Sequence, residues 1–261
     1  MTTLLQTILL AIVQGITEWL PVSSSGHMLL LENMLGITEN MGLILLFHLS
    51  SALVILLTFR KEIFQILAAF YRMDFQNKYG KLGLSLIIGS VPLGLIGYFL
   101  RDFVISFFAS LFITGIGFII TGCFLLIGKQ IDNKLKRKKN KHITFTNSFI
   151  IGLFQTLALV PGISRSGMTI GSGFILGLTK KDAFLFSFLL GLLAILGASI
   201  LELPSLTSVP LLPGMIGFII CFIVGYYTLQ FTLTILEKET FFSIGWYCLG
   251  IGILTLLYTL F

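Results

Sequence analysis

A polar motif occurs twice in a chain that is otherwise very hydrophobic. Residues 14–28 read QGITEWLPVSSSGHM and residues 155–169 read QTLALVPGISRSGMT, and the two align without gaps at an offset of 141 positions, from 14 to 155. Each stretch lies between two apolar runs, so both are expected near membrane depth. Ionisable side chains at that depth are costly and mark functional sites. Here they are Glu18, His27 and Arg165.

The composition places the chain among polytopic helical membrane proteins. Of its 261 residues, 56% are hydrophobic and only 11% are charged, which is too apolar for a soluble domain of this length. The net charge of +6 is attributed to basic loops that orient the helices, so no nucleic acid partner is expected. Cys123, Cys221 and Cys248 lie inside apolar runs and are interpreted as packing residues.

The hydrophobic pattern predicts six membrane-spanning helices and two broken ones. Each of the six segments approaches the ~20 residues that a bilayer core requires. They cover about 42–59, 82–100, 103–128, 183–201, 210–230 and 240–260.

Two further apolar stretches, about 4–35 and 146–178, are interrupted by Pro21 and by Pro161-Gly162. Broken backbone at membrane depth is tolerated only where protein or a water-filled cavity surrounds it. We therefore predict two re-entrant helix hairpins. The alternative is four additional short spans.

The basic residues predict the orientation of the chain. We assume that each hairpin returns to its own side and that each of the six spans crosses. Fifteen of the seventeen Lys and Arg then lie on one face, whereas Arg101 lies on the opposite face and Arg165 lies in the second hairpin. Loops rich in Lys and Arg face the cytoplasm. The first hairpin is thus expected to enter from outside, the second from the cytoplasm, and both termini to lie outside.

The basic linker 129–145, which begins KQIDNKLKRKKNKH, divides the chain into two similar halves. Residues 1–128 and 146–261 each hold one hairpin and three spans. Because three is odd, the halves insert with opposite orientations. The predicted fold is an all-α polytopic membrane protein built as an inverted repeat, and such repeats place a site near the midplane where the broken elements meet.

The second hairpin has the features of an anion site. Arg165 lies between Ser164 and Ser166, just after a Pro-Gly turn from which a helix can begin. A helix N-terminus presents free N–H groups and partial positive charge, and a guanidinium matches the geometry of phosphate. The alternative is that Arg165 pairs with Glu18 only to hold the hairpins together.

The first hairpin supplies groups for nucleophilic chemistry. Ser23 and Ser24 precede His27 at spacings that place hydroxyl and imidazole on one helix face. This suits a serine nucleophile with a histidine base, or a histidine that attacks phosphorus itself. The alternative is a helix-capping Ser23 and a hydrogen-bonding His27. Glu18, one turn after Gln14, could orient His27, act as a base or help to hold a cation.

The motifs QGITEWLPVSSSGH at 14–27 and PGISRSGMT at 161–169 resemble the two signature motifs of the bacterial undecaprenyl-diphosphate phosphatases, the bacitracin-resistance family. The resemblance covers essentially the whole chain in length, motif spacing and span pattern. It implies a hydrolase of the bacterial inner (cytoplasmic) membrane that removes the terminal phosphate of undecaprenyl diphosphate. Such an enzyme recycles the lipid carrier of cell-wall precursors. Bacitracin is then expected to compete for this lipid and not to bind the protein.

The resemblance also implies the site residues. The family's Glu-or-Gln, its Glu, its serine pair, its histidine and its arginine are matched by Gln14, Glu18, Ser23, Ser24, His27 and Arg165. We assign Ser24 as nucleophile, His27 as its base, Glu18 as the group that orients His27 or a metal, and Arg165 as phosphate ligand. The expected substrate-binding residues are Gln14, Ser23, Ser25, Ser164, Ser166 and Thr169.

The family's active site opens toward the outer face and is reported to use a divalent cation. Mg²⁺ or Ca²⁺ at Glu18 is therefore an open alternative, weakened because Gln14 stands where many members have a second carboxylate. Membrane lipids are expected partners, and a homodimer is left open. The competing class is a polyprenyl-phosphate transporter or flippase, which would use the same anion site but would not need His27 as a base.

Overall fold

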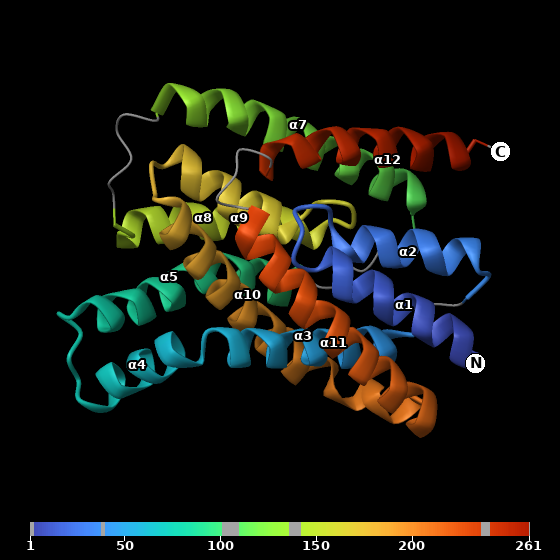
Figure 1. Ribbon diagram of the computed structural model, residues 1–261, viewed down its shortest axis with the longest axis horizontal. Helices are drawn as coiled ribbons and strands as arrows, with labels where there is room; N and C mark the ends of the chain where they lie inside the picture. Colours follow the sequence, from blue (N-terminus) through green and yellow to red (C-terminus); the bar gives the residue numbers. More distant parts are fainter. Residues whose placement is uncertain (1–2, 38–39, 101–109, 136–141, 236–240, 261) are drawn as a thin grey trace.

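The computed structural model describes residues 3–37, 40–100, 110–135, 142–235 and 241–260, and within them it contains helices and no strand (Figure 1). The first half comprises α1 (Leu4–Thr17), α2 (Ser24–Met34), α3 (Met41–Thr58), α4 (Arg60–Tyr71), α5 (Lys78–Phe99) and α7 (Leu111–Leu135). The second comprises α8 (Phe145–Thr156), η1 (Leu157–Leu159), α9 (Arg165–Ile175), α10 (Lys180–Glu202), η2 (Leu203–Ser208), α11 (Leu211–Ile235), η3 (Phe241–Ser243) and α12 (Ile244–Tyr258).

Within the described residues, six helices are long and apolar enough to cross a bilayer. They are α3, α5, α7, α10, α11 and α12, and they fall on the six predicted spans. The prediction of an all-α polytopic membrane protein is therefore confirmed. The span predicted from 103 is described from Leu111 onward, and α7 continues into the predicted linker. Residues 101–109 and 136–141 lie outside the described part of the chain.

One helix occupies a segment where the sequence analysis expects a loop. Residues 60–81 contain α4, whose side chains Ile66 and Phe70 pack over Gly83 of α5. A Cβ on that glycine would lie 2.9 Å from Ile66 Cγ2. The helix forms because this half-buried apolar stripe packs against a neighbouring span, a contact that the charge of the segment does not indicate.

Both polar motifs form helix–turn–helix units. The first consists of α1 and α2, and the second of α8, η1 and α9. Ser23 caps α2 by accepting a hydrogen bond from Gly26 N at 3.3 Å, and Ser164 caps α9 by accepting one from Gly167 N at 3.1 Å. These are equivalent positions in the two motifs. The two short helices that follow the turns therefore begin in the same way.

The turns of the two hairpins meet in the middle of the molecule (Figure 1). From there α1 and α2 extend toward the end at which both chain termini lie, and α8 and α9 extend toward the opposite end. Helix α1 packs against α11, and its counterpart α8 packs against α5. This pairing is what two similar halves of opposite orientation would produce. Their orientation in a bilayer stays a prediction.

Helices α7 and α12 are in backbone contact. A Cβ on Gly122 would lie 2.8 Å from the carbonyl oxygen of Gly245, and the reverse distance is also 2.8 Å. Further along the pair, a Cβ on Gly252 would lie 2.9 Å from the carbonyl oxygen of Gly115. Small residues allow this close packing where lipid removes the hydrophobic drive for helix association. The register of α12 over α7 is thereby fixed.

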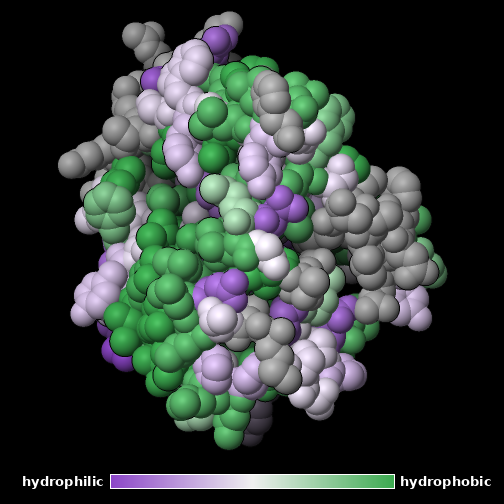
Figure 2. All heavy atoms as spheres, turned by 90° about the vertical axis from the view of Figure 1, so that its right-hand side faces the viewer, coloured by the Kyte–Doolittle hydropathy of each residue, from purple (hydrophilic) through white to green (hydrophobic). Residues whose placement is uncertain are grey.

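The surface is largely apolar. Figure 2 looks onto the end at which the termini lie, and hydrophobic residues cover large areas of it, with hydrophilic residues in separate patches. Leucines and phenylalanines such as Phe64 and Leu211 are 72% and 79% exposed. A surface of this kind is stable only against lipid.

Candidate active site at the meeting of the hairpins

The turns of the two hairpins are in direct contact. Gly162 has φ +87, a left-handed conformation that favours glycine, and a Cβ on Gly26 would lie 2.9 Å from its Cα. Ser166 Oγ donates to the carbonyl oxygen of Leu20 at 3.1 Å. The polar motifs, which lie far apart in the sequence, thus form one cluster.

The carboxylate of Glu18 lies at the centre of this cluster. Arg165 Nη2 donates to Glu18 Oε1, and Ser24 Oγ donates to Glu18 Oε2 at 2.6 Å. Gln14 Nε2 also donates to Oε2, at 3.1 Å. Glu18 is 7% exposed. A buried carboxylate requires such partners, and here they come from α1, α2 and α9.

Arg165 is only partly used by these contacts. Its Nη1 atom is buried and has no hydrogen-bond partner within the described part of the chain. An unpaired buried guanidinium nitrogen is costly, so a polar group of a ligand is expected to occupy it. Because α9 begins at Arg165, the positive end of its helix dipole lies at the same place. The arrangement is suited to a phosphate.

Gly191 of α10 makes room for this arginine. A Cβ on Gly191 would overlap with Arg165 Nη1 and would lie 2.5 Å from Cζ. We expect Gly191→Ala to displace the guanidinium and to lower any activity that depends on it by about 10²-fold, a typical loss for a mispositioned group. The matched control is Gly197→Ala on the same helix, where a Cβ would meet nothing within 4 Å. Equal activity of the two variants in a turnover assay would contradict this role.

The remaining candidate residues hold the turns in shape. Ser23 Oγ lies 3.3 Å from Ser25 Oγ, and Ser164 Oγ lies 3.2 Å from Ser166 Oγ, so the same pair recurs in both hairpins. Thr169 Oγ1 donates to the carbonyl oxygen of Arg165 at 2.9 Å. Ser23 also has φ +68, a left-handed conformation that is strained for serine and typical of functional turns. These residues surround the cluster, and their contact with substrate stays a prediction.

His27 does not contact Ser24 in this arrangement. Its Nδ1 atom lies 2.8 Å from the carbonyl oxygen of Ser23, which only accepts, so Nδ1 carries the proton. Its Nε2 atom lies 2.7 Å from the hydroxyl of Tyr247. The sequence analysis assigned His27 as base of Ser24. The structure instead places Glu18 beside the serine hydroxyl.

Three further side chains border the cluster, and none of them was assigned a role from the sequence. Tyr247 reaches His27 from α12, and Thr121 of α7 accepts from Ser164 N at 3.0 Å. His48 places Nε2 3.9 Å from Glu18 Oε2. Its position inside a predicted span was a signal for His48. Nothing in the local sequence pointed to the other two.

The donor set around Glu18 offers a divalent cation one carboxylate. Both carboxylate oxygens accept hydrogen bonds in this structure, and one of the donors is the cationic Arg165. Gln14 Oε1 is an oxygen of the cluster without a partner in the described residues, and it is neutral. Mg²⁺ is usually held by one or two carboxylates together with waters and substrate phosphates. A cation at Glu18 would thus need further oxygen ligands from the substrate, and a metal requirement stays an expectation.

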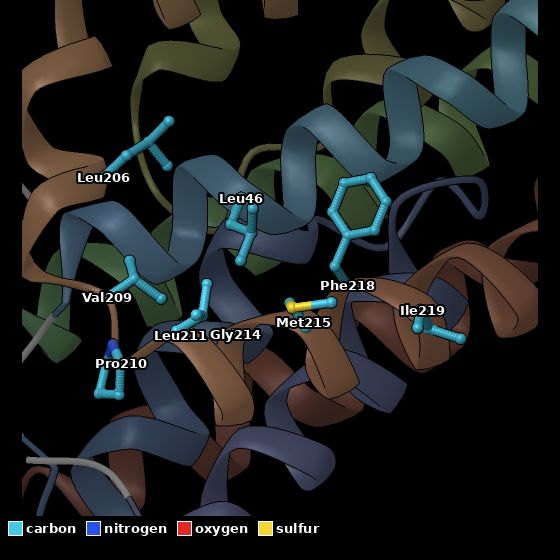
Figure 3. Close-up of a pocket in the computed structure, with 9 residues that line it drawn as sticks. All are labelled: Leu46, Leu206, Val209, Pro210, Leu211, Gly214, Met215, Phe218 and Ile219. Atoms are coloured by element: carbon cyan, nitrogen blue, oxygen red, sulfur yellow. The ribbon is translucent and has the colours of Figure 1, made fainter.

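A separate apolar groove lies between α3, η2 and the start of α11 (Figure 3). Its volume is about 270 Å³. Figure 3 shows Leu46 of α3 facing Gly214 and Met215 of α11. The described residues that line it include none of the candidate site residues. The groove therefore offers hydrophobic surface without the chemistry of the cluster.

The fold and the cluster define a polytopic membrane protein with a buried polar cluster where two helix hairpins meet. The chain belongs to the family described as bacitracin resistance protein BacA, which matches residues 7–254. Among its relatives, an undecaprenyl-diphosphatase of Carboxydothermus hydrogenoformans is 41% identical over 96% of both chains. One from Methanococcus vannielii is 37% identical over 97% of this chain and all of the relative. One from Alkaliphilus metalliredigens is 34% identical over 99% of both.

Proposed function

We propose that this protein is an integral membrane phosphatase that hydrolyses undecaprenyl diphosphate to undecaprenyl phosphate and inorganic phosphate. The observation that carries the proposal is the unpaired Arg165 Nη1 beside the Ser24–Glu18 hydrogen bond. It combines a phosphate ligand, a nucleophile and a base in one place. The family and the names of the relatives support the same substrate. A lipid flippase would need the anion site but not the serine–carboxylate pair.

In the first step, Ser24 Oγ attacks the terminal phosphorus and transfers its proton to Glu18 Oε2, 2.6 Å away. The bond from this phosphorus to the bridging oxygen breaks, and undecaprenyl phosphate leaves with the electron pair. Arg165 neutralises charge on the equatorial oxygens. The N–H groups of the first two residues of α2 and α9 assist, because the caps bind the N–H group of the third residue and the helix provides no partner for the first two.

In the second step, water hydrolyses the phosphoserine. We assign His27 as the base for this water, because the proton on Nδ1 leaves the lone pair on Nε2. His27 lies one turn after Ser24 in α2, so both side chains serve the same face. The P–Oγ bond breaks, phosphate is released and the serine recovers its proton. A direct attack by His27 would use the same lone pair on Nε2, and it is less favoured because the hydroxyl of Ser24 already has a carboxylate at 2.6 Å to receive its proton.

We further propose that the protein lies in the bacterial inner membrane with the site open to the outer face. The support is the bias of Lys and Arg toward the loops on the other side. Bacitracin resistance would then follow from removal of the lipid diphosphate for which bacitracin competes. A homodimer and a bound divalent cation stay expectations from the family resemblance.

His27→Gln distinguishes the phosphatase from a lipid carrier. An enzyme is expected to lose steady-state phosphate release by about 10²-fold, the usual contribution of a general base. A carrier would keep most of its lipid movement, because glutamine retains a polar group. The measurement is phosphate release in detergent alongside lipid transfer in proteoliposomes, with the exposed His142→Gln as control. Phosphate release that is unchanged in His27→Gln would rule out the assigned role.

A further inference from the structure

Helix α12 meets the first hairpin through two consecutive residues. Tyr247 hydroxyl lies 2.7 Å from His27 Nε2, and the buried Cys248 Sγ donates to the carbonyl oxygen of Pro21 at 3.4 Å. The glycine contacts between α7 and α12 fix the register that brings both residues to the turn. The position of Tyr247 is thus set by the packing of the fold and not only by its own hydrogen bond.

His27 is enclosed by rings from these two helices. The rings of His27 and Tyr247 are nearly parallel, with an interplanar angle of 5° and centroids 5.7 Å apart. The buried Phe118 of α7 meets the imidazole edge-on, at 5.0 Å and 76°. Together with the Ser23 carbonyl at Nδ1, these contacts leave the imidazole one orientation and one neutral tautomer.

We propose that Tyr247 is a positioning residue for the phosphatase reaction, acting through His27. Its hydroxyl donates to the lone pair on His27 Nε2 and keeps the imidazole in this orientation and tautomer until water replaces the hydroxyl. Tyr247 is 51% exposed, so its hydroxyl can turn away without breaking the core. The inference rests on the proposed function, in which His27 is the base of the second step.

The first test is Tyr247→Phe, which removes the hydroxyl and keeps the ring. The expected result is a fall in kcat of about tenfold with KM within twofold, because orientation of a base affects chemistry more than substrate binding. The matched control is Tyr258→Phe, on the same helix and 48% exposed, which is expected to match the wild type. Wild-type kcat in Tyr247→Phe, or a change confined to KM, would overturn the proposal.

A double-mutant cycle separates positioning from general support of the fold. If Tyr247 acts through His27, Tyr247→Phe has no further effect on kcat in a His27→Gln background. Additive losses would show that tyrosine acts elsewhere. The hydrogen bond has its own readout in ¹⁵N-histidine-labelled protein, where Tyr247→Phe is expected to shift the Nε2 resonance that His27→Gln removes. An unchanged resonance would overturn the proposal for Tyr247, whether or not the wild type releases phosphate. Absence of phosphate release by the wild type would instead refute the proposed function.

Discussion

Arg165→Ala is expected to lower kcat/KM for phosphate release by about 10³-fold or more, the range for an arginine that stabilises phosphoryl transfer. The variant removes the phosphate ligand and leaves Glu18 without its ion pair. The charge of a buried carboxylate then lacks compensation. The measurement is initial-rate kinetics on undecaprenyl diphosphate with purified protein.

Arg165→Lys keeps a positive charge to pair with the buried Glu18, so this variant is expected to fold. Lysine offers a point charge in place of the planar fork, and it cannot bind Glu18 and present a second fixed nitrogen in the position of Nη1. A loss of about 10²-fold is expected, while Arg72→Ala, on the exposed segment after α4, should leave the rate unchanged. If Arg165→Lys were as active as the wild type, the bidentate role of the arginine would be wrong.

Ser24→Ala is expected to lower turnover by about 10³-fold and to abolish the covalent intermediate, because the attacking oxygen is absent. The hydrogen bond to Glu18 at 2.6 Å is lost as well. Rapid acid quenching of the wild type with substrate labelled in the terminal phosphate should yield phosphoserine. Ser90→Ala is the control, because that hydroxyl only donates to the carbonyl oxygen of Leu86.

A parallel quench in alkaline detergent, which preserves phosphohistidine, distinguishes the two nucleophiles that the sequence left open. If His27 attacked phosphorus, a base-stable and acid-labile phosphohistidine would form in the wild type and would persist in Ser24→Ala. Such a species would form at Nε2, which would have to leave the Tyr247 hydroxyl while Nδ1 kept its hydrogen bond to Ser23. Its detection would contradict the assignment of Ser24.

Local patterns were sufficient to predict the elements of the fold. Proline in the middle of an apolar run identified the broken helices, because membrane depth leaves few ways to satisfy interrupted backbone. Run length located the six spans. The helix within 60–81 depended on packing, which the pattern of charge and hydropathy does not contain.

Contacts between the two polar motifs could be predicted from the sequence. Contacts that other helices make with the site could not. The meeting of Glu18 and Arg165 followed from two polar motifs in opposed hairpins. Gly191 and Tyr247 approach from α10 and α12, and no local spacing relates them to the motifs. The hydrogen-bond partner of the Ser24 hydroxyl depended on a side-chain rotation that spacing along α2 could not decide.

The two halves also differ at the position of Glu18. At the offset that aligns Gln14 with Gln155, Glu18 aligns with Leu159. The side chain of Gln155 is buried, and neither of its polar atoms has a partner among the described residues. Only the first hairpin therefore has a carboxylate to receive a proton. The proposed mechanism therefore places its chemistry in the first hairpin and gives the second the phosphate ligand.

The most direct test of the phosphatase is release of inorganic phosphate from undecaprenyl diphosphate by the purified full-length protein in detergent. The expected result is one phosphate and one undecaprenyl phosphate for each substrate consumed, with the activity lost in Arg165→Ala and in His27→Gln. A folded wild-type protein that releases no phosphate, with or without Mg²⁺ or Ca²⁺, would contradict the phosphatase. Lipid transport at the same anion site would then explain the hairpins better.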